Sequence, residues 1–256
     1  MIPIGDENPT FRQPLVTWLL LGLIFATWVL VQGAGFDEYR LAASACNLGM
    51  VPAELTKSLP VGYGVPMGRG LACVIDADPI NKWTPFTSMF LHGSWAHLIG
   101  NSLFLWVFGN NVEDSMGRLR FLVFYLVCGL AAAGAHVMVD PRSPLPTVGA
   151  SGAISGIMGA YLVLYPRVKV KMLFWFLLFI RVFRVPAWLV LIWWFALQVL
   201  EGLPQLRPVE TLRGGTAVWA HVGGFVAGVL LVKLFENREL VRRHLAVADA
   251  RGVWER

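Results

Sequence analysis

Two polar residues, far apart in the sequence, have the types needed for nucleophilic chemistry. Ser151 lies in a Gly-Ala-Ser-Gly sequence, and His221 lies in an Ala-His-Val-Gly-Gly sequence. A serine hydroxyl becomes a strong nucleophile only when a positioned base removes its proton, and an imidazole is such a base near neutral pH. No acidic residue lies near the pair in either apolar segment. These residues therefore predict a Ser–His dyad, without the carboxylate of a triad, that could attack an amide carbonyl.

A second polar pair could stabilise the anion that such an attack creates. His97 and Asn101 are four residues apart, which places them on one face of a helix, about one turn apart. Both side chains can donate hydrogen bonds, and the amides at the start of the helix that carries Ser151 could add more donors. We expect His97, Asn101 and Ser151 to form an oxyanion hole. The alternative, that the two side chains only form structural hydrogen bonds between helices, stays open.

Small residues follow both members of the dyad at helical spacing: Gly152, Gly156, Gly224 and Gly228. Helices with glycine faces can approach closely, which could bring Ser151 and His221 within hydrogen-bond distance. Taken singly, each residue has a plainer explanation. Ser151 could be one more packing residue in a Gly-rich helix, and His221 a buried structural histidine. The serine does not lie in the G-x-S-x-G turn of soluble hydrolases, because Ala153 replaces the second glycine.

The composition places these residues in a membrane protein. Of 256 residues, 56% are hydrophobic and 14% are charged, whereas soluble domains carry about 25% charged residues. Eleven Trp and sixteen Phe fit the aromatic belts at a bilayer surface. The net charge of +5 does not indicate nucleic-acid binding, because the basic residues lie beside apolar segments, as membrane anchors do. We expect contact with a lipid bilayer and no nucleic acid.

Six apolar segments are long enough, or nearly so, to cross a bilayer as helices, which takes roughly 20 residues. They cover about residues 14–33, 94–112, 119–139, 149–166, 185–203 and 216–235. No basic region precedes the first segment, and no small-residue cleavage site clearly ends it. We therefore expect a retained helix rather than a signal peptide. Together the segments predict an all-α membrane protein with six transmembrane helices.

Basic residues predict how these helices are oriented. They are concentrated after the second, fourth and sixth segments, which places both termini in the cytoplasm. The chain then divides into a cytoplasmic N-terminus (1–13), a membrane domain (14–236) and a cytoplasmic tail (237–256). Residues 34–82 form a long external loop, whose Gly and Pro content predicts irregular structure. The sequence of the tail predicts a short amphipathic helix there.

This orientation brings the candidate residues to one level in the membrane. His97, Ser151 and His221 each lie within the first two turns of a helix that starts outside. At about 1.5 Å per residue, all three lie roughly 3–10 Å below the outer surface. Hydrolysis needs water, so the site must open to the outside through a polar cavity.

The apolar run Met172–Ile180 is too short to span a bilayer alone. Basic residues flank it, so we expect an interfacial segment or an extension of the fifth helix, with a seventh span as the alternative. In the external loop, Cys46 and Cys73 could form a disulfide if that compartment is oxidising, with two unpaired cysteines as the alternative.

At these residues the sequence resembles the rhomboid family of intramembrane serine proteases, over about residues 83–233. The elements of the resemblance are Trp83 and the Phe-Thr-Ser-Met-Phe-Leu-His sequence after it, His97-x-x-x-Asn101, Glu113 followed by Gly117 and Arg118, the Gly-Ala-Ser-Gly sequence at Ser151, and the Ala-His-Val-Gly-Gly-x-x-x-Gly sequence at His221. Each element is weak alone, but their order on the expected helices is specific.

The resemblance implies Ser151 as nucleophile, His221 as general base, and His97 and Asn101 as oxyanion donors. It also implies a six-helix core, no metal or cofactor, and transmembrane protein substrates cut near the lipid boundary. The fifth helix would resemble a lateral gate, and residues 34–82 a loop partly embedded in the outer leaflet. We expect a serine endopeptidase of a bacterial inner membrane; its oligomeric state is left open.

The chain departs from the family pattern at two positions. Some members carry Trp-Arg where this chain has Trp83-Thr84, which puts the anchoring of that loop in doubt. Some carry a Tyr, stacked on the catalytic histidine, where this chain has Ser155. The imidazole of His221 must therefore be positioned by other contacts.

Two other functions fit parts of the sequence. A rhomboid-like pseudoprotease would bind or chaperone membrane proteins, and would need neither Ser151 nor His221. A transporter or channel would carry charged residues deep in its spans or paired broken helices, and the sequence shows little of either.

Overall fold

The fold is that of a computed structural model, which describes residues 2–68, 70–176, 179–206 and 217–250. Some residues of the expected segments lie outside this description: residue 69 of the loop, residues 177–178 of the short apolar run, residue 216 of the sixth segment and residues 251–256 of the tail.

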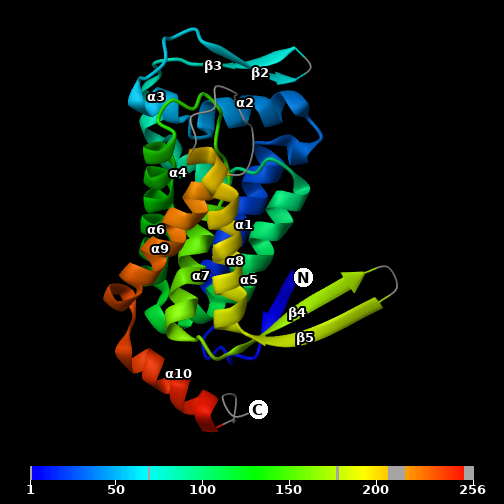
Figure 1. The fold of residues 1–256 in the computed structure, drawn as a ribbon, viewed down its shortest axis with the longest axis vertical. Helices are drawn as coiled ribbons and strands as arrows, with labels where there is room; N and C mark the ends of the chain where they lie inside the picture. Colours follow the sequence, from blue (N-terminus) through cyan, green and yellow to red (C-terminus); the bar gives the residue numbers. More distant parts are fainter. Residues whose placement is uncertain (1, 69, 177–178, 207–216, 251–256) are drawn as a thin grey trace.

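A bundle of long helices forms the body of the molecule (Figure 1). Within the described residues these helices are α1 (Leu15–Leu30), α5 (Trp95–Met116), α6 (Arg118–Val139), α7 (Ser151–Leu164), α8 (Ala187–Gly202) and α9 (Val218–Phe235). Each coincides with one of the expected apolar segments. Three stretches, α6, α8 with its extension to Leu206, and α9, are long and apolar enough to cross a membrane, whereas α1 and α7 are apolar but shorter. The number of spans therefore stays a prediction.

Short elements cover one end of the bundle, between α1 and α5. They are η1 (Gly33–Gly35), α2 (Glu38–Leu48), α3 (Pro52–Thr56), β2 (Gly64–Gly68), β3 (Leu71–Val74), η2 (Pro79–Trp83), α4 (Thr84–Thr87) and η3 (Ser88–Phe90). A Cys46–Cys73 disulfide, with Cα atoms 5.3 Å apart, joins α2 to β3. We call this end the disulfide end. The expectation of irregular structure here is wrong, because the bridge and the β2–β3 pairing order the segment.

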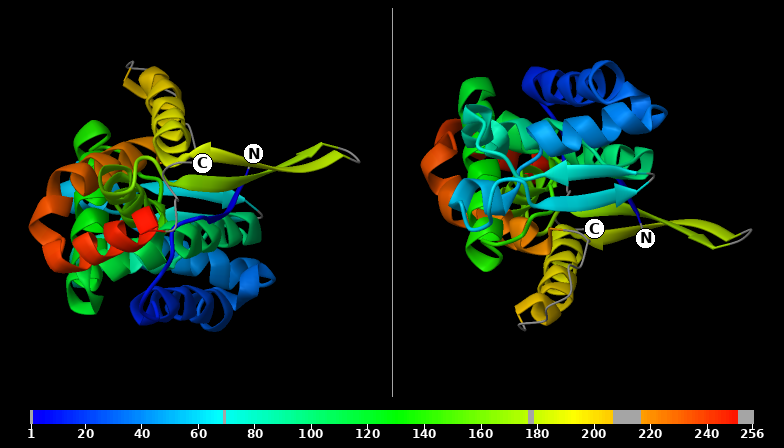
Figure 2. Two further views of the ribbon diagram at one scale, coloured as in Figure 1. Left: turned by 90° about the horizontal axis from the view of Figure 1, so that it is seen from below. Right: turned by 90° about the horizontal axis from the view of Figure 1, so that it is seen from above.

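A three-stranded antiparallel sheet lies at the opposite end, the sheet end. Its strands are β1 (Ile2–Asp6), β4 (Lys169–Phe176) and β5 (Phe179–Pro186), in the order β1-β4-β5. The β4–β5 hairpin projects from the bundle near α8 (Figure 2). The described residues of the run, 172–176 and 179–180, therefore form strands and do not extend the fifth helix, so the all-α expectation is incomplete. Valine and aromatic residues, which favour strands, fill the hairpin, and the distant strand β1 completes the pairing. The expected tail helix is present as α10 (Arg238–Ala250).

A buried carboxylate joins the first two long helices. Glu113, near the end of α5, accepts hydrogen bonds from the backbone N–H groups of Val16 and Thr17, at 3.0 and 2.8 Å, and from the Thr17 hydroxyl at 2.8 Å. These amides belong to the first turn of α1, which has no intrahelical partners for them. The N-cap residue, Pro14, makes no side-chain hydrogen bond. Glu113 therefore caps α1 from a neighbouring helix and fixes its position on α5.

Glycines bring α7 and α9 into backbone contact. A Cβ atom on Gly224 would collide with the carbonyl oxygen of Gly152, and one on Gly228 would collide with the carbonyl oxygen of Gly156. Because both contacts are with backbone, no side-chain rotation could relieve them. This close approach sets the spacing of the two helices that carry Ser151 and His221.

Replacing Gly224 with Leu should therefore push α9 away from α7. We expect the Gly224→Leu change to lower the free energy of unfolding by about 3 kcal/mol or more, the upper end of the cost of overpacking, because only backbone atoms could yield. Denaturant unfolding in detergent would measure this. Gly134→Leu on α6, where a Cβ meets no atom within 4 Å, should not lower the stability. Equal stability of the two variants would show that the α7–α9 contact is looser than described.

One carboxyl group at the sheet end, that of Asp6, is held in a desolvated, hydrogen-bonded site. Oδ2 of Asp6 accepts from the Tyr161 hydroxyl at 2.5 Å and from Nδ2 of Asn111 at 2.8 Å. Burial raises the pKa of Asp6 to about 7, against the opposing effects of the Tyr161 hydrogen bond and of the Lys171 charge. The folded chain therefore holds this proton up to a higher pH than the unfolded chain does.

This raised pKa predicts a pH-dependent stability. Between about pH 4 and pH 7, where the folded state binds more protons than the unfolded state, stability should fall as pH rises, and above that range it should level off. Asp6→Asn, which cannot ionise, should weaken this fall. Unfolding midpoints in detergent across pH 4–8 would test it, with Asp249→Asn, an exposed carboxyl on α10, as the control. A fall as steep in Asp6→Asn as in the unmodified chain would assign the effect to another group.

Candidate active site

The two residues of the predicted dyad lie at hydrogen-bond distance. Ser151 is the first residue of α7, and His221 lies in the first turn of α9. Oγ of Ser151 is 2.8 Å from Nε2 of His221. The imidazole is buried, with 8% of the residue exposed. The glycine contact between α7 and α9 makes this distance possible, because it brings the starts of the two helices together.

The other ring nitrogen of His221 also has a partner. Nδ1 lies 2.6 Å from Oε1 of Gln198 on α8. An amide oxygen can only accept, so Nδ1 carries the proton and Nε2 offers its lone pair to the Ser151 hydroxyl. This is the tautomer that a general base requires. The Trp194 ring, also from α8, lies against the imidazole at 5.9 Å between ring centroids.

Sequence reasoning assigned no role to Gln198 or Trp194. The signal for Gln198 was present, because it is the one polar residue in the otherwise apolar stretch from Ala187 to Leu200. A lone amide in such a stretch needs a hydrogen-bond partner. This chain has no tyrosine at position 155 to contact the imidazole of His221. Gln198 and Trp194 supply such contacts instead.

Ser155, one turn after Ser151, is engaged elsewhere. Its hydroxyl donates to the backbone oxygen of Ser151 at 2.6 Å, and only 1% of the residue is exposed. The hydroxyl is therefore satisfied within its own helix, as serines in apolar helices often are. This leaves Ser151 as the serine of α7 whose hydroxyl faces the imidazole.

His97 lies beside the turn that leads into α7. Gly149 adopts φ +134°, and a Cβ there would lie 2.8 Å from Nε2 of His97, so only glycine lets the imidazole approach. Nδ1 of His97 accepts a long hydrogen bond from the Gly93 N–H, at 3.4 Å. In the neutral ring the proton then resides on Nε2, the atom that faces Gly149. His97 is thus placed as a donor close to Ser151.

The side chain of Asn101 is partly occupied. Its Nδ2 lies 2.9 Å from Nε2 of the buried His92, which accepts one of the two amide protons. The second proton is available for another acceptor. Gln32, at the end of α1, holds the backbone of His92 with two hydrogen bonds of 2.8 Å. Sequence reasoning gave His92 no function; here it orients Asn101.

An open cavity of about 1240 Å³ lies over these groups. Its lining includes all four candidate side chains, Ser151, His221, His97 and Asn101, together with residues of the disulfide end. A cavity of this size holds many water molecules as well as a peptide segment. Among the described residues, no group of three or more His, Cys, Asp and Glu side chains gathers as metal ligands would.

Comparison with known proteins gives one consistent result. The Rhomboid domain family matches residues 80–238. The chain is 28% identical to RHOMBOID-like protein 5 of Arabidopsis thaliana over 174 residues, 62% of this chain and 56% of that protein. It is 44% identical to Rhomboid protease GluP of Bacillus subtilis over 80 residues, 31% of this chain and 15% of that protein. It is 32% identical to Rhomboid-like protein 11, chloroplastic, of Arabidopsis thaliana over 175 residues, 66% of this chain and 58% of that protein.

The chain thus spans little more than half of the plant relatives and a small part of the bacterial one. Because the relatives include plant proteins, one of them chloroplastic, they do not support a bacterial inner membrane over an organelle membrane. The matched residues run from η2 to the start of α10 and include every candidate site residue. With its long apolar helices the protein is a membrane protein, and it belongs to the rhomboid family.

Proposed function

We propose that this protein is an intramembrane serine endopeptidase that hydrolyses peptide bonds of transmembrane substrates. The observation that carries the proposal is the 2.8 Å contact between Oγ of Ser151 and Nε2 of His221, inside an open cavity. A serine and a histidine kept only for packing would not need this geometry or this tautomer. The name of one relative, a rhomboid protease, supports the same activity.

The reaction follows from the placement of these groups. As Oγ of Ser151 attacks the substrate carbonyl carbon, Nε2 of His221 takes the hydroxyl proton. The carbonyl oxygen becomes an anion, stabilised by Nε2–H of His97, by the second amide proton of Asn101 and by the N–H groups at the start of α7. His221 then gives its proton to the leaving amine, and the peptide bond breaks. Water from the cavity then attacks the acyl-serine carbonyl while His221 takes its proton. His221 returns this proton to Oγ of Ser151 as the ester bond breaks, which releases the carboxylic acid product and restores Ser151.

We propose further that the six long helices all cross the membrane, with both termini on one side and the disulfide end on the other. The positions of the helices and the basic residues between them support this arrangement. The site then lies near the disulfide-end surface, where water enters the cavity and a substrate helix meets the lipid boundary. Peptide bonds near that boundary are the expected targets.

The dyad can be tested by labelling and by cleavage. A fluorophosphonate probe, which reacts with activated serine hydroxyls, should label Ser151 in the purified protein. Ser151→Ala and His221→Ala should neither be labelled nor cleave a transmembrane substrate in detergent. Labelling should weaken at acid pH, because a protonated imidazole cannot accept the serine proton. Ser155→Ala, one turn away, should keep both properties.

Each result of this test has one meaning. Cleavage by Ser151→Ala at the original rate would refute the enzymatic assignment. An unmodified chain that neither cleaves nor reacts with the probe would favour the alternative, a rhomboid-like pseudoprotease that binds membrane proteins.

The oxyanion donors should matter less than the dyad. Loss of one oxyanion-hole donor costs about 2.7–4 kcal/mol of transition-state stabilisation in a soluble protease. Because several donors are present here, the loss of any one of them should cost less. We expect His97→Ala and Asn101→Ala to lower kcat by about 10- to 100-fold, with little change in KM. Asn110→Ala, a matched change near the other end of α5, should leave kcat unchanged. Normal kcat in both site variants would remove these residues from the mechanism.

A further inference from the structure

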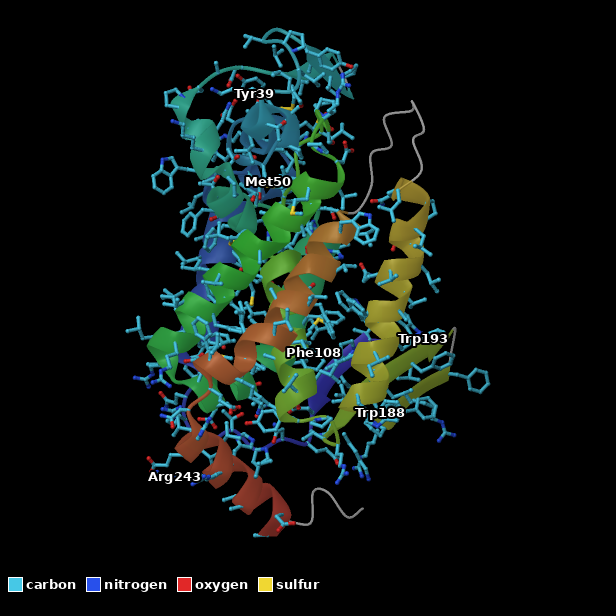
Figure 3. The ribbon with its side chains drawn as sticks, turned by 60° about the vertical axis from the view of Figure 1, so that its left-hand side comes forward. Tyr39, Met50, Phe108, Trp188, Trp193 and Arg243 are labelled. Atoms are coloured by element: carbon cyan, nitrogen blue, oxygen red, sulfur yellow. A yellow bond between two sulfur atoms is a disulfide. The ribbon has the colours of Figure 1, made fainter. Side chains whose placement is uncertain are left out.

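The base of the dyad is held by a helix that carries neither of its members. Gln198 and Trp194 both reach His221 from α8, through the 2.6 Å hydrogen bond to Nδ1 and the ring contact. Of the residues of α8, Ala187, Leu191 and Gly202 are buried, whereas most of α7 is buried. Trp188 and Trp193, labelled on this helix in Figure 3, are 46% and 65% exposed. The helix that orients the base thus lies at the periphery of the bundle.

The chemistry of the dyad depends on which ring nitrogen of His221 carries the proton. If the amide oxygen of Gln198 faces Nδ1, the proton resides there and Nε2 can accept from Ser151. If the amide were turned so that its NH₂ group faced Nδ1, the proton would move to Nε2. Ser151 would then have no acceptor. The orientation of one neutral amide therefore separates a competent dyad from an incompetent one.

The same hydrogen bond also favours the charge that develops during catalysis. When His221 takes the serine proton it becomes a cation, and its Nδ1–H bond to Oε1 becomes charge-assisted and stronger. A carboxylate does this in a triad. Here a neutral amide oxygen does it, so no buried negative charge has to be kept in an apolar helix, where its desolvation would be costly.

We propose that Gln198 is the positioning residue of His221: it fixes the Nδ1–H tautomer and stabilises the imidazolium. The inference rests on the proposed Ser–His mechanism and adds a residue to it. Gln198 acts through His221 and not on the substrate. Because the bond comes from α8, the competence of the dyad depends on where that helix lies.

Three variants separate this role from simple packing. Gln198→Met keeps the length of the side chain but removes the acceptor, and Gln198→Glu keeps the acceptor and adds a charge. Gln13→Met is the matched control, because Gln13 precedes α1, does not line the cavity and makes no hydrogen bond to His221 within the described part of the chain. Unfolding midpoints in detergent would be recorded for all three.

We expect Gln198→Met to lower kcat and the rate of fluorophosphonate labelling of Ser151 by roughly tenfold or more, part of what a positioned base contributes. KM should change less than about twofold. Gln198→Glu should retain most of the activity, with the acid limb of its pH profile moved to higher pH, because an added carboxylate favours the imidazolium. Other titratable groups line the cavity as well: His97, His136, Asp140 and Glu201. They are the same in every variant. Gln13→Met should match the unmodified chain.

The tautomer of His221 can be determined without an activity assay. The ¹⁵N NMR signals of the His221 ring, assigned by their loss in His221→Ala, should show a protonated Nδ1 in the neutral enzyme and lose that preference in Gln198→Met. A neutral ring protonated at Nε2 would overturn the proposal. So would normal turnover by Gln198→Met, or a Gln198→Glu variant as inactive as Gln198→Met. A chain that shows the expected tautomer but no cleavage would instead count against the proposed protease function alone.

Discussion

The backbone contact between α7 and α9 is the constraint on which the site depends. Gly224 and Gly228 leave no room for a side chain against Gly152 and Gly156, so the two helices lie as close as peptide groups allow. In a bilayer, where water cannot drive helices together, such close van der Waals packing is a main source of association. Ser151 starts α7 and His221 lies in the first turn of α9. The helix contact therefore brings the two side chains together without the help of flexible loops.

Other parts of the chain set the details that this contact leaves free. Helix separation determines how far Ser151 lies from His221, but not how the imidazole is rotated or which nitrogen holds the proton. Gln198 and Trp194 on α8 determine the rotation of the ring and the position of its proton. The turn before α7 supplies space for His97 through Gly149, whose φ of +134° and missing side chain admit the ring. Distance, orientation and donor placement thus have separate structural sources.

Sequence reasoning located the long helices because each is a continuous apolar run, a property of neighbouring residues. It also placed Ser151 and His221 on facing helices, since glycine faces indicate which helices can touch; their catalytic roles stay predictions. It missed the β1–β4 pairing, because no local pattern links residues so distant in the chain. It missed the role of Gln198 because the side a polar residue faces on a peripheral helix depends on tertiary packing. A lone amide among apolar residues was nevertheless a usable signal.

The sheet has a consequence for the order in which the protein can be assembled. β1 precedes α1 in the chain, whereas its partner β4 follows α7. During synthesis β1 must therefore stay without its partner strand while α1, α5, α6 and α7 are made, and α8 follows β5 in the chain. Closure of the sheet therefore requires that the chain has been made through α7, the helix that carries Ser151, and on into β4. A strand that stays unpaired for this long can pair with a wrong partner. Pro3 and Asp6 in β1 disfavour such mispairing.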